Sequence, residues 1–184
     1  MTRHILFVQG GGSGAHDAWD NHLVDDLQRR LGPDFAIRYP RLPQEDDPDF
    51  ARWSAALADE LASLEDDAII VAHSIGATIL INAIAKSPPA VRLGGIFLLA
   101  APFIGPGGWP SGDVKPDPKL GDATPKGVPI FFYHGSSDDT ASPEHAELYA
   151  RAVPQAVVRR LAGRDHQLNN DLTEVAADIR SLAG

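Results

Sequence analysis

The sequence predicts a single three-layer α/β domain over residues 1–184, with a parallel sheet of about six strands between two layers of helices. Short apolar runs of four to six residues recur along the chain. They alternate with longer stretches in which apolar residues return every three or four positions. Such runs are typical of strands buried on both faces, and such stretches are typical of amphipathic helices. The connections that contain these helices are long enough to join parallel strands.

The first half of the chain alternates predicted strands and helices, which turn-forming residues separate. Residues 35–39 alternate in polarity like an edge strand, and Gly32-Pro33 ends the helix before them. Pro48 suits the first turn of the next helix, with Asp47 as its cap. The predicted strands are residues 5–8, 35–39 and 68–72, and the predicted helices are residues 19–31, 48–64 and 76–85.

The second half continues this alternation but contains one long irregular segment. Its predicted strands are residues 95–100, 130–133 and 156–161, and its predicted helices are residues 142–152 and 172–182. Residues 101–128 contain six prolines and six glycines, which is too broken for regular core structure. Because long loops in compact domains are usually lids or binding loops, we expect this one to cover a site, with Phe103 and Trp109 facing a substrate. The alternative is that both rings only anchor the loop to the core.

Composition and charge argue against several classes of function. The net charge of −9 at pH 7 is unsuited to nucleic acid or to an anionic membrane, because both need a basic surface. The absence of cysteine excludes disulfides, thiol catalysis and thiolate metal sites. The N-terminus leads straight into a strand-like run without a signal peptide, so we expect a cytoplasmic protein. The sequence carries no signal for an oligomeric state.

The segment from Ala68 to Ala85 contains the motif around which the chain is organised. A buried strand ends at Ala72, and helical spacing begins at Gly76, so that Ser74 stands at the apex of an abrupt turn. Small residues at Ala72 and Gly76 let the strand and the helix pass closely, as a strained nucleophile elbow demands. The pattern is A-H-S-I-G, where the usual form is G-x-S-x-G.

Two other interpretations of this segment are compatible with its composition. The first is a membrane-spanning helix, for which the segment is just long enough. Acidic residues 65–67 and Lys86, which flank it closely, argue against this. Four polar residues also lie within it, namely His73, Ser74, Thr78 and Asn82. The second alternative is a buried strand–helix unit whose serine merely turns the chain, and the motif alone leaves this open.

A serine nucleophile needs a base, and the base needs an orienting group. His166 is the preferred base, because it lies in a glycine-started loop between the last predicted strand and the last helix. Asp138 and Asp139 follow the strand at residues 130–133 and are both candidates for the acid. Asp165 is excluded, because it directly precedes His166. The order serine, aspartate, histidine is that of α/β-hydrolases.

Acyl transfer also needs hydrogen-bond donors for the oxyanion. The amide of Ile75, directly after the serine, is expected to supply one, and the helix N-terminus reinforces it. The glycine turn after the first strand is expected to supply the other, with Gly11 preferred by position and Gly12 next. The same turn fits a dinucleotide-binding pattern, G-x-G-x-x-A. That alternative is weaker, because Arg38-Tyr39 stand where an acidic residue is required.

The whole chain resembles a small member of the α/β-hydrolase superfamily, and in particular the compact serine hydrolases of the retinoblastoma-binding-protein type. Four segments carry this resemblance, in this order: residues 9–12 (QGGG), 72–76 (AHSIG), 135–139 (GSSDD) and 163–166 (GRDH). The resemblance implies that the second aspartate of the pair orients the histidine, which favours Asp139 over Asp138.

Together these observations predict a serine hydrolase that cleaves ester or similar acyl bonds of a small-molecule substrate. Ser74 would attack, His166 would carry the proton and Asp139 would hold His166, without a cofactor or metal. The rival hypothesis is a catalytically silent binding module with the same fold, since the family includes members better known for binding partners.

Overall fold

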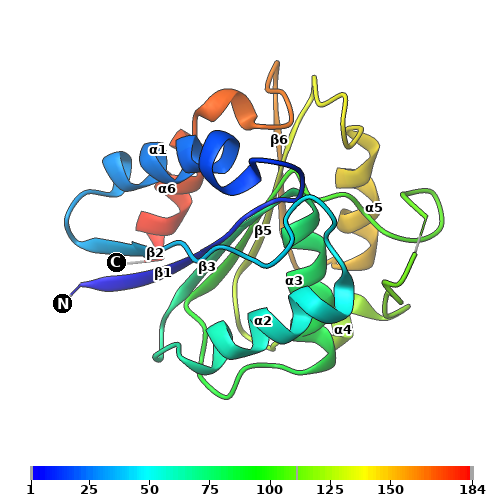
Figure 1. The fold of residues 1–184 in the computed structure, drawn as a ribbon, viewed down its shortest axis with the longest axis horizontal. Coiled ribbons are helices and arrows are strands. Elements are labelled where there is room, and N and C mark those ends of the chain that lie inside the picture. The colour runs from blue at the N-terminus through cyan, green and yellow to red at the C-terminus, as the bar shows by residue number, and fades with distance from the viewer. Residues whose placement is uncertain (1, 111, 183–184) are drawn as a thin grey trace.

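The computed structural model describes residues 2–110 and 112–182, and its strands form one sheet. The strands are β1 (Arg3–Val8), β2 (Phe35–Arg38), β3 (Ile69–His73), β4 (Gly95–Leu99), β5 (Ile130–Gly135) and β6 (Val157–Leu161). Their order across the sheet is β2-β1-β3-β4-β5-β6, and every neighbouring pair is parallel (Figure 1). The predicted parallel sheet of about six strands is therefore confirmed. All six carboxyl ends point to the same edge.

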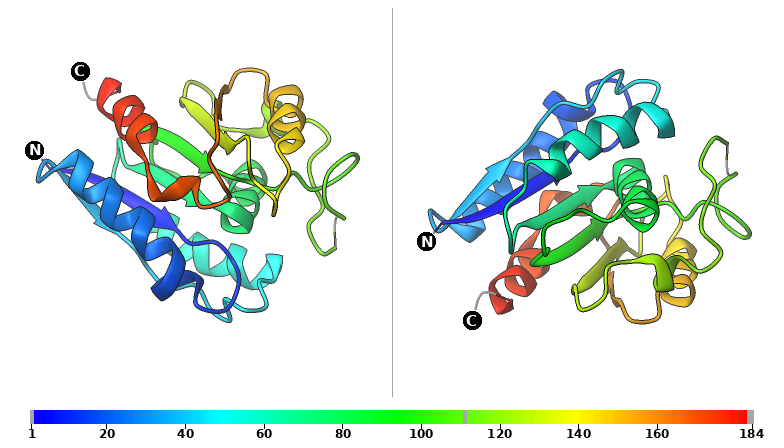
Figure 2. Two further views of the ribbon diagram at one scale, coloured as in Figure 1. Left: turned by 90° about the horizontal axis from the view of Figure 1, so that it is seen from above. Right: turned by 90° about the horizontal axis from the view of Figure 1, so that it is seen from below.

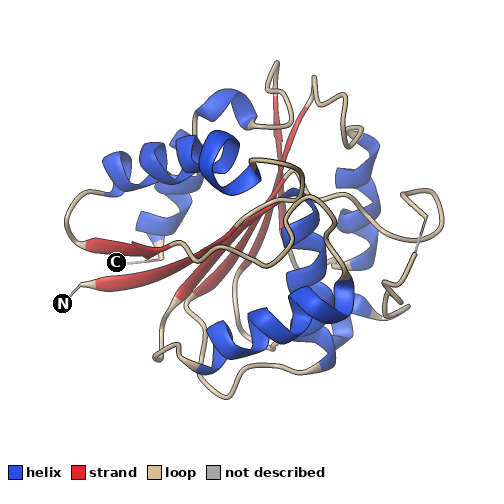
Figure 3. Ribbon diagram, in the orientation of Figure 1, coloured by secondary structure: helices blue, strands red, loops and turns tan. Residues whose placement is uncertain are grey.

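Helices cover both faces of this sheet and complete the three layers (Figure 2). One face carries α1 and α6, which pack against each other, and the other carries α2, α3, α4 and α5. Figure 3 shows the single sheet between these layers. The helical elements are the π-helix η1 (Ala15–Asp20), α1 (Asn21–Leu31), α2 (Phe50–Ala62), α3 (Ser74–Lys86), α4 (Leu120–Ala123), α5 (Glu144–Ala152), the 3₁₀-helix η2 (Leu168–Asn170) and α6 (Thr173–Ser181).

The alternation of side chains along each strand divides the core into two clusters. In β1, Leu6 and Val8 join the cluster under α2 and α3, whereas Ile5 and Phe7 join the cluster under α1 and α6. The inner strands β1, β3, β4 and β5 are buried over most or all of their length. The edge strands β2 and β6 are largely half-buried or exposed. This burial on both faces explains why the inner strands appear in the sequence as continuous apolar runs.

The segment from Ala68 to Ala85 is a buried strand followed by a helix, as the elbow hypothesis requires. β3 ends at His73 and α3 begins at Ser74. Among the described residues, no helix is both long enough and apolar enough to cross a membrane. This segment is therefore not the single continuous helix that a membrane span would require.

Some local predictions need correction. Asp49, not Asp47, caps α2: its backbone is extended and its carboxylate accepts a hydrogen bond from the Arg52 amide at 2.8 Å. Pro48 consequently lies just before the helix rather than in its first turn. The irregular segment at residues 101–128 contains the short helix α4 and one isolated bridge between Ile104 and Trp109.

Candidate active site

Four loops meet at the carboxyl edge of the sheet, because all strands point the same way. They follow β1, β3, β5 and β6 and hold the glycine turn, Ser74, the aspartate pair and His166, respectively. The connection after β3 is the tightest, since Ser74 follows the last strand residue and is itself the first residue of α3. Its φ of 53° lies in the left-handed region, which a serine adopts only under constraint.

Close approach at Gly76 explains this constraint. A Cβ atom placed on Gly76 would lie 1.9 Å from the carbonyl oxygen of Gln9, so only glycine fits against the end of β1. Ala72 is fully buried and paired with Val8 on one side and Leu98 on the other. The need for a small residue after the serine, predicted from the sequence, therefore arises at Gly76 from the close approach of the β1 backbone.

Ser74, His166 and Asp138 form a chain of contacts. The Ser74 Oγ lies 2.8 Å from the Nε2 of His166, and the Nδ1 of His166 lies 2.8 Å from the Oδ2 of Asp138. Ser74 is 7% exposed, and the side chains of His166 and Asp138 are 15% and 0% exposed. Because Asp138 is ionised, Nδ1 of His166 carries the proton, which leaves the Nε2 lone pair for the serine hydroxyl.

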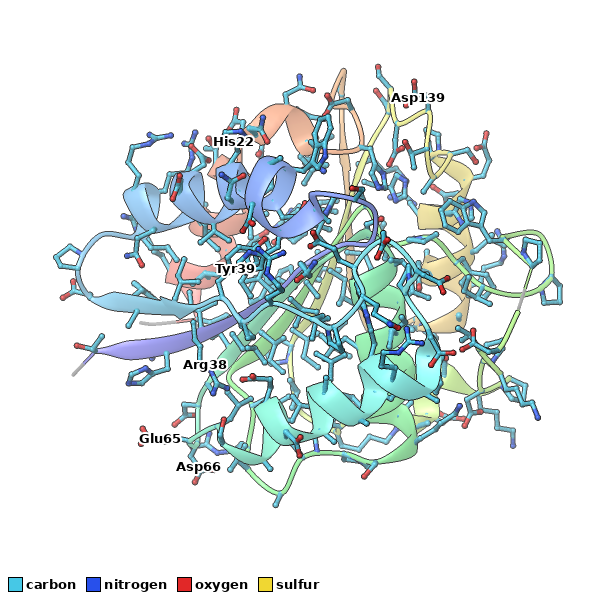
Figure 4. All side chains as sticks on the ribbon, in the orientation of Figure 1. His22, Arg38, Tyr39, Glu65, Asp66 and Asp139 are labelled. Carbon is cyan, nitrogen blue, oxygen red and sulfur yellow. The ribbon has the colours of Figure 1, made fainter. Side chains whose placement is uncertain are left out.

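The prediction that Asp139 contacts His166 is wrong. Asp139 is exposed and lies at the outer end of the loop after β5 (Figure 4), whereas Asp138 is buried and reaches His166. The turn itself causes the difference. The Oδ1 of Asp138 accepts hydrogen bonds from the amides of Thr140 and Ala141, both at 2.9 Å, and these turn its carboxylate inward.

Asp138 is held in its ionised form by its neighbours. Burial alone would raise its pKa, but hydrogen bonds from His134 and His166 outweigh it and hold the pKa of Asp138 well below its usual range. The Nε2 of His134 lies 3.2 Å from the Asp138 Oδ2 and donates to the Ala141 carbonyl at 2.7 Å. His134, which lies on β5, therefore helps to hold the Asp138 carboxylate in place.

The two residues predicted to supply the oxyanion donors, Gly11 and Ile75, are neighbours in space. A Cβ on Gly11 would lie 2.8 Å from the Cγ2 of Ile75, so the two residues are in direct contact. The amides on both sides of Gly11 are already used: Gly10 donates to the Asp20 carboxylate at 2.6 Å, and Gly12 donates to the Glu45 carbonyl at 2.6 Å. Within the described residues, the Gly11 amide has no acceptor, so Gly11 rather than Gly12 remains the predicted donor.

Glu45 fixes the shape of this glycine turn, a role that the sequence did not reveal. Its carboxylate accepts hydrogen bonds from Gln9 at 2.8 Å, from the His16 amide at 3.0 Å and from the Gly14 amide at 3.2 Å. Burial opposes its ionisation, but these bonds hold the pKa of Glu45 below its usual value. Glu45 belongs to an acidic loop, and such loops are commonly solvated, which is why it gave no local signal.

Phe103 and Trp109 lie on the irregular segment beside α5. The ring of Phe103 packs edge-on against Tyr149 at 5.2 Å, and the ring of Trp109 packs edge-on against His145 at 6.1 Å. Both side chains are half-buried. The Phe103 amide also donates to the Nδ1 of His145 at 2.7 Å. These contacts anchor the segment to α5, and no described contact joins either ring to Ser74.

Comparisons with known proteins identify a family for this chain. A family model described as serine hydrolase matches residues 6–167. This chain belongs to the serine hydrolase family. A comparison with curated proteins gives no match. The narrower resemblance to the retinoblastoma-binding-protein type stays a prediction, whereas membership of the α/β-hydrolase superfamily is confirmed.

Solved structures share the fold of this serine hydrolase over its whole length. The ydeN gene product of B. subtilis has a TM-score of 0.74 at 18% identity and covers 99% of each chain. A YdeN-like hydrolase of Pectobacterium atrosepticum has a TM-score of 0.68 at 19% identity, covering 98% of this chain and 92% of its own. The esterase RhEst1 of a Rhodococcus species has a TM-score of 0.68 at 14% identity, covering 100% and 91%.

Proposed function

We propose that this serine hydrolase cleaves ester or similar acyl bonds through an acyl-enzyme formed on Ser74. The observation that carries the proposal is the continuous contact from Ser74 through His166 to Asp138, with 2.8 Å at each step. A serine hydroxyl becomes a competent nucleophile when an adjacent imidazole takes its proton and a carboxylate holds that imidazole. The esterase and hydrolase neighbours share the fold in which this chemistry is expected.

The proposed reaction has two matched halves. The Ser74 Oγ attacks the acyl carbon while the Nε2 of His166 takes the hydroxyl proton, and the negative oxygen accepts hydrogen bonds from the amides of Ile75 and Gly11. The intermediate collapses, and the leaving alcohol receives the proton from His166. Water then attacks the acyl-enzyme by the same route, which releases the acid and restores Ser74. Asp138 keeps its negative charge throughout and stabilises the imidazolium.

A fluorophosphonate probe tests the nucleophile directly. We expect the probe to label the wild-type protein and not the Ser74→Ala variant, because labelling needs an activated serine hydroxyl. Ser87→Ala is the matched control, since Ser87 is an exposed serine at the other end of α3 and should label like the wild type. Equal labelling of the wild type and Ser74→Ala would refute the assignment. A folded wild type that neither labels nor turns over esters would support the silent binding module.

Trp109 is proposed to contact the acyl chain of the substrate as well as to anchor its segment. Trp109→Ala should then change the ratio of kcat/KM for long and short p-nitrophenyl esters by about tenfold, the size expected for a few lost apolar contacts. The measurement is the ratio across a series of chain lengths, together with the thermal midpoint. A lower midpoint with an unchanged ratio would mean that the ring only holds the segment against His145.

A further inference from the structure

A second histidine–aspartate pair lies buried directly behind the proposed nucleophile. Asp20, the last residue of η1, is 1% exposed, and His73, the last residue of β3, is also 1% exposed. The Oδ1 of Asp20 lies 2.9 Å from the Nδ1 of His73. The proposed mechanism uses neither residue. A buried carboxylate lowers stability unless its charge is compensated, so this pair calls for a physical explanation.

The contacts of His73 determine its protonation. Its Nε2 lies 3.0 Å from the carbonyl oxygen of His166, and because a carbonyl can only accept, this nitrogen carries a proton. Its Nδ1 faces a carboxylate oxygen, which is a second acceptor. At 2.9 Å the two atoms are within ion-pair distance. A neutral His73 would leave the buried Asp20 carboxylate without a counter-charge on this side.

The Asp20 carboxylate joins the loops that the proposed chemistry needs. Its Oδ2 accepts the Gly10 amide at 2.6 Å, directly before the proposed oxyanion donor Gly11. Its Oδ1 accepts the side chain of Gln167 at 3.3 Å, directly after His166. His73 itself directly precedes Ser74. One buried pair therefore contacts the glycine turn, the elbow and the histidine loop at once.

We propose that His73 and Asp20 form a permanent buried ion pair that positions the oxyanion turn and the His166 loop around Ser74. This inference rests on the proposed function for its catalytic meaning. It makes His73 and Asp20 positioning residues that act through Gly11 and His166. It further assigns His73 a lasting positive charge, with its ring centroid 5.1 Å from that of His166. That charge lies beside the ring that serves as the base in the proposed mechanism.

The charges around His73 agree with this assignment. Burial opposes the charged form, but the Asp20 carboxylate and the hydrogen bond to the His166 carbonyl outweigh it and raise the pKa of His73 above its usual value. Asp138, from the loop after β5, adds a further attraction, and His166 faces His73 from the loop after β6. For Asp20, burial is likewise outweighed by His73 and the Gly10 amide, which lower the pKa of the carboxyl. The two shifts have the signs that an ion pair requires.

Histidine side-chain ¹⁵N–¹H spectra test the charge without reference to turnover. At about pH 8, which is roughly 1.5 units above the ordinary histidine pKa, we expect one imidazolium with both nitrogens protonated. That signal should vanish in His73→Gln and in Asp20→Asn. Its absence from the wild type, or its persistence in a folded His73→Gln variant, would overturn the proposal. If His73→Gln does not fold, the spectrum of Asp20→Asn alone tests the proposal. That variant should fold, because asparagine keeps an oxygen that can accept the Gly10 amide.

The pH profile of kcat/KM tests positioning. His73→Gln should lower kcat about 100-fold with little change in KM, as expected when reacting groups are slightly misplaced. The His73→Gln variant leaves the negative charge of Asp20 without a counter-charge near His166. The acid limb of the kcat/KM profile should therefore move to higher pH. Adding Asp20→Asn should return the limb to its wild-type position while kcat stays low. An unmoved limb in His73→Gln would refute the electrostatic role. Failure of Ser74 to label, with the imidazolium intact, would instead refute the proposed function.

Discussion

Asp138→Asn is expected to lower kcat by about 10⁴-fold, because asparagine can no longer hold the required tautomer of His166 or balance its positive charge. Asp139→Asn should leave kcat within about twofold of the wild type, as expected for an exposed residue without a role in the site. The two variants differ by one position in the same turn and remove the same charge. Their comparison therefore separates the local contact with His166 from any general effect of charge.

Steady-state ester hydrolysis measures this contrast, with circular dichroism to show that both variants are folded. Asparagine keeps an oxygen that can accept the amides of Thr140 and Ala141, so the turn should survive in Asp138→Asn. A large loss in Asp139→Asn with little change in Asp138→Asn would contradict the contact at 2.8 Å between Asp138 and His166. Equal, small losses in both would mean that His166 works without a carboxylate.

Gly76→Ala is expected to reduce the free energy of unfolding by about 3 kcal/mol or more, at the upper end of what an overpacked core costs. The added Cβ would lie 1.9 Å from the Gln9 carbonyl oxygen, and a backbone atom cannot rotate away as a side chain can. β1 and α3 would have to separate, which displaces the glycine turn from Ser74. Activity should therefore fall together with stability.

Urea unfolding measures this effect, and Gly32→Ala is its matched control. Gly32 ends α1 with a φ of 76°, and a Cβ there meets no atom within 4 Å. That variant should cost about 1–3 kcal/mol, all of it from a φ of 76° and a ψ of −166°, a backbone conformation that residues other than glycine rarely adopt. If Gly76→Ala is no more destabilised than Gly32→Ala, the close passage of strand and helix at the elbow is not required for folding.

The fold followed from the sequence because burial on both faces leaves a local signal. Each inner strand packs against helices on both sides, so its residues are apolar without interruption. The elbow was equally visible, since its steric demands fall on Ala72 and Gly76, only two positions from Ser74. In both cases, the residues that specify the structure are neighbours in the chain.

The acid and its supports could not be predicted in the same way. Asp138 and Asp139 share one turn, and only the amides of Thr140 and Ala141 decide which carboxylate turns inward. Asp20 and Glu45 resemble ordinary surface acids in the sequence. They become buried or enclosed only when η1 and the loop before α2 fold over the sheet edge. Such contacts between distant segments produce no periodic pattern in the amino-acid sequence.

The exposed outer strands have a consequence for association between molecules. An edge strand presents unpaired backbone groups to which another chain could add. Here Arg38 lies on β2, and Arg159 and Arg160 lie on β6, each exposed and each paired with a helix carboxylate of the same molecule. Charged side chains on an edge strand are a common means by which natural sheets oppose edge-to-edge pairing. Both margins of this sheet carry such side chains.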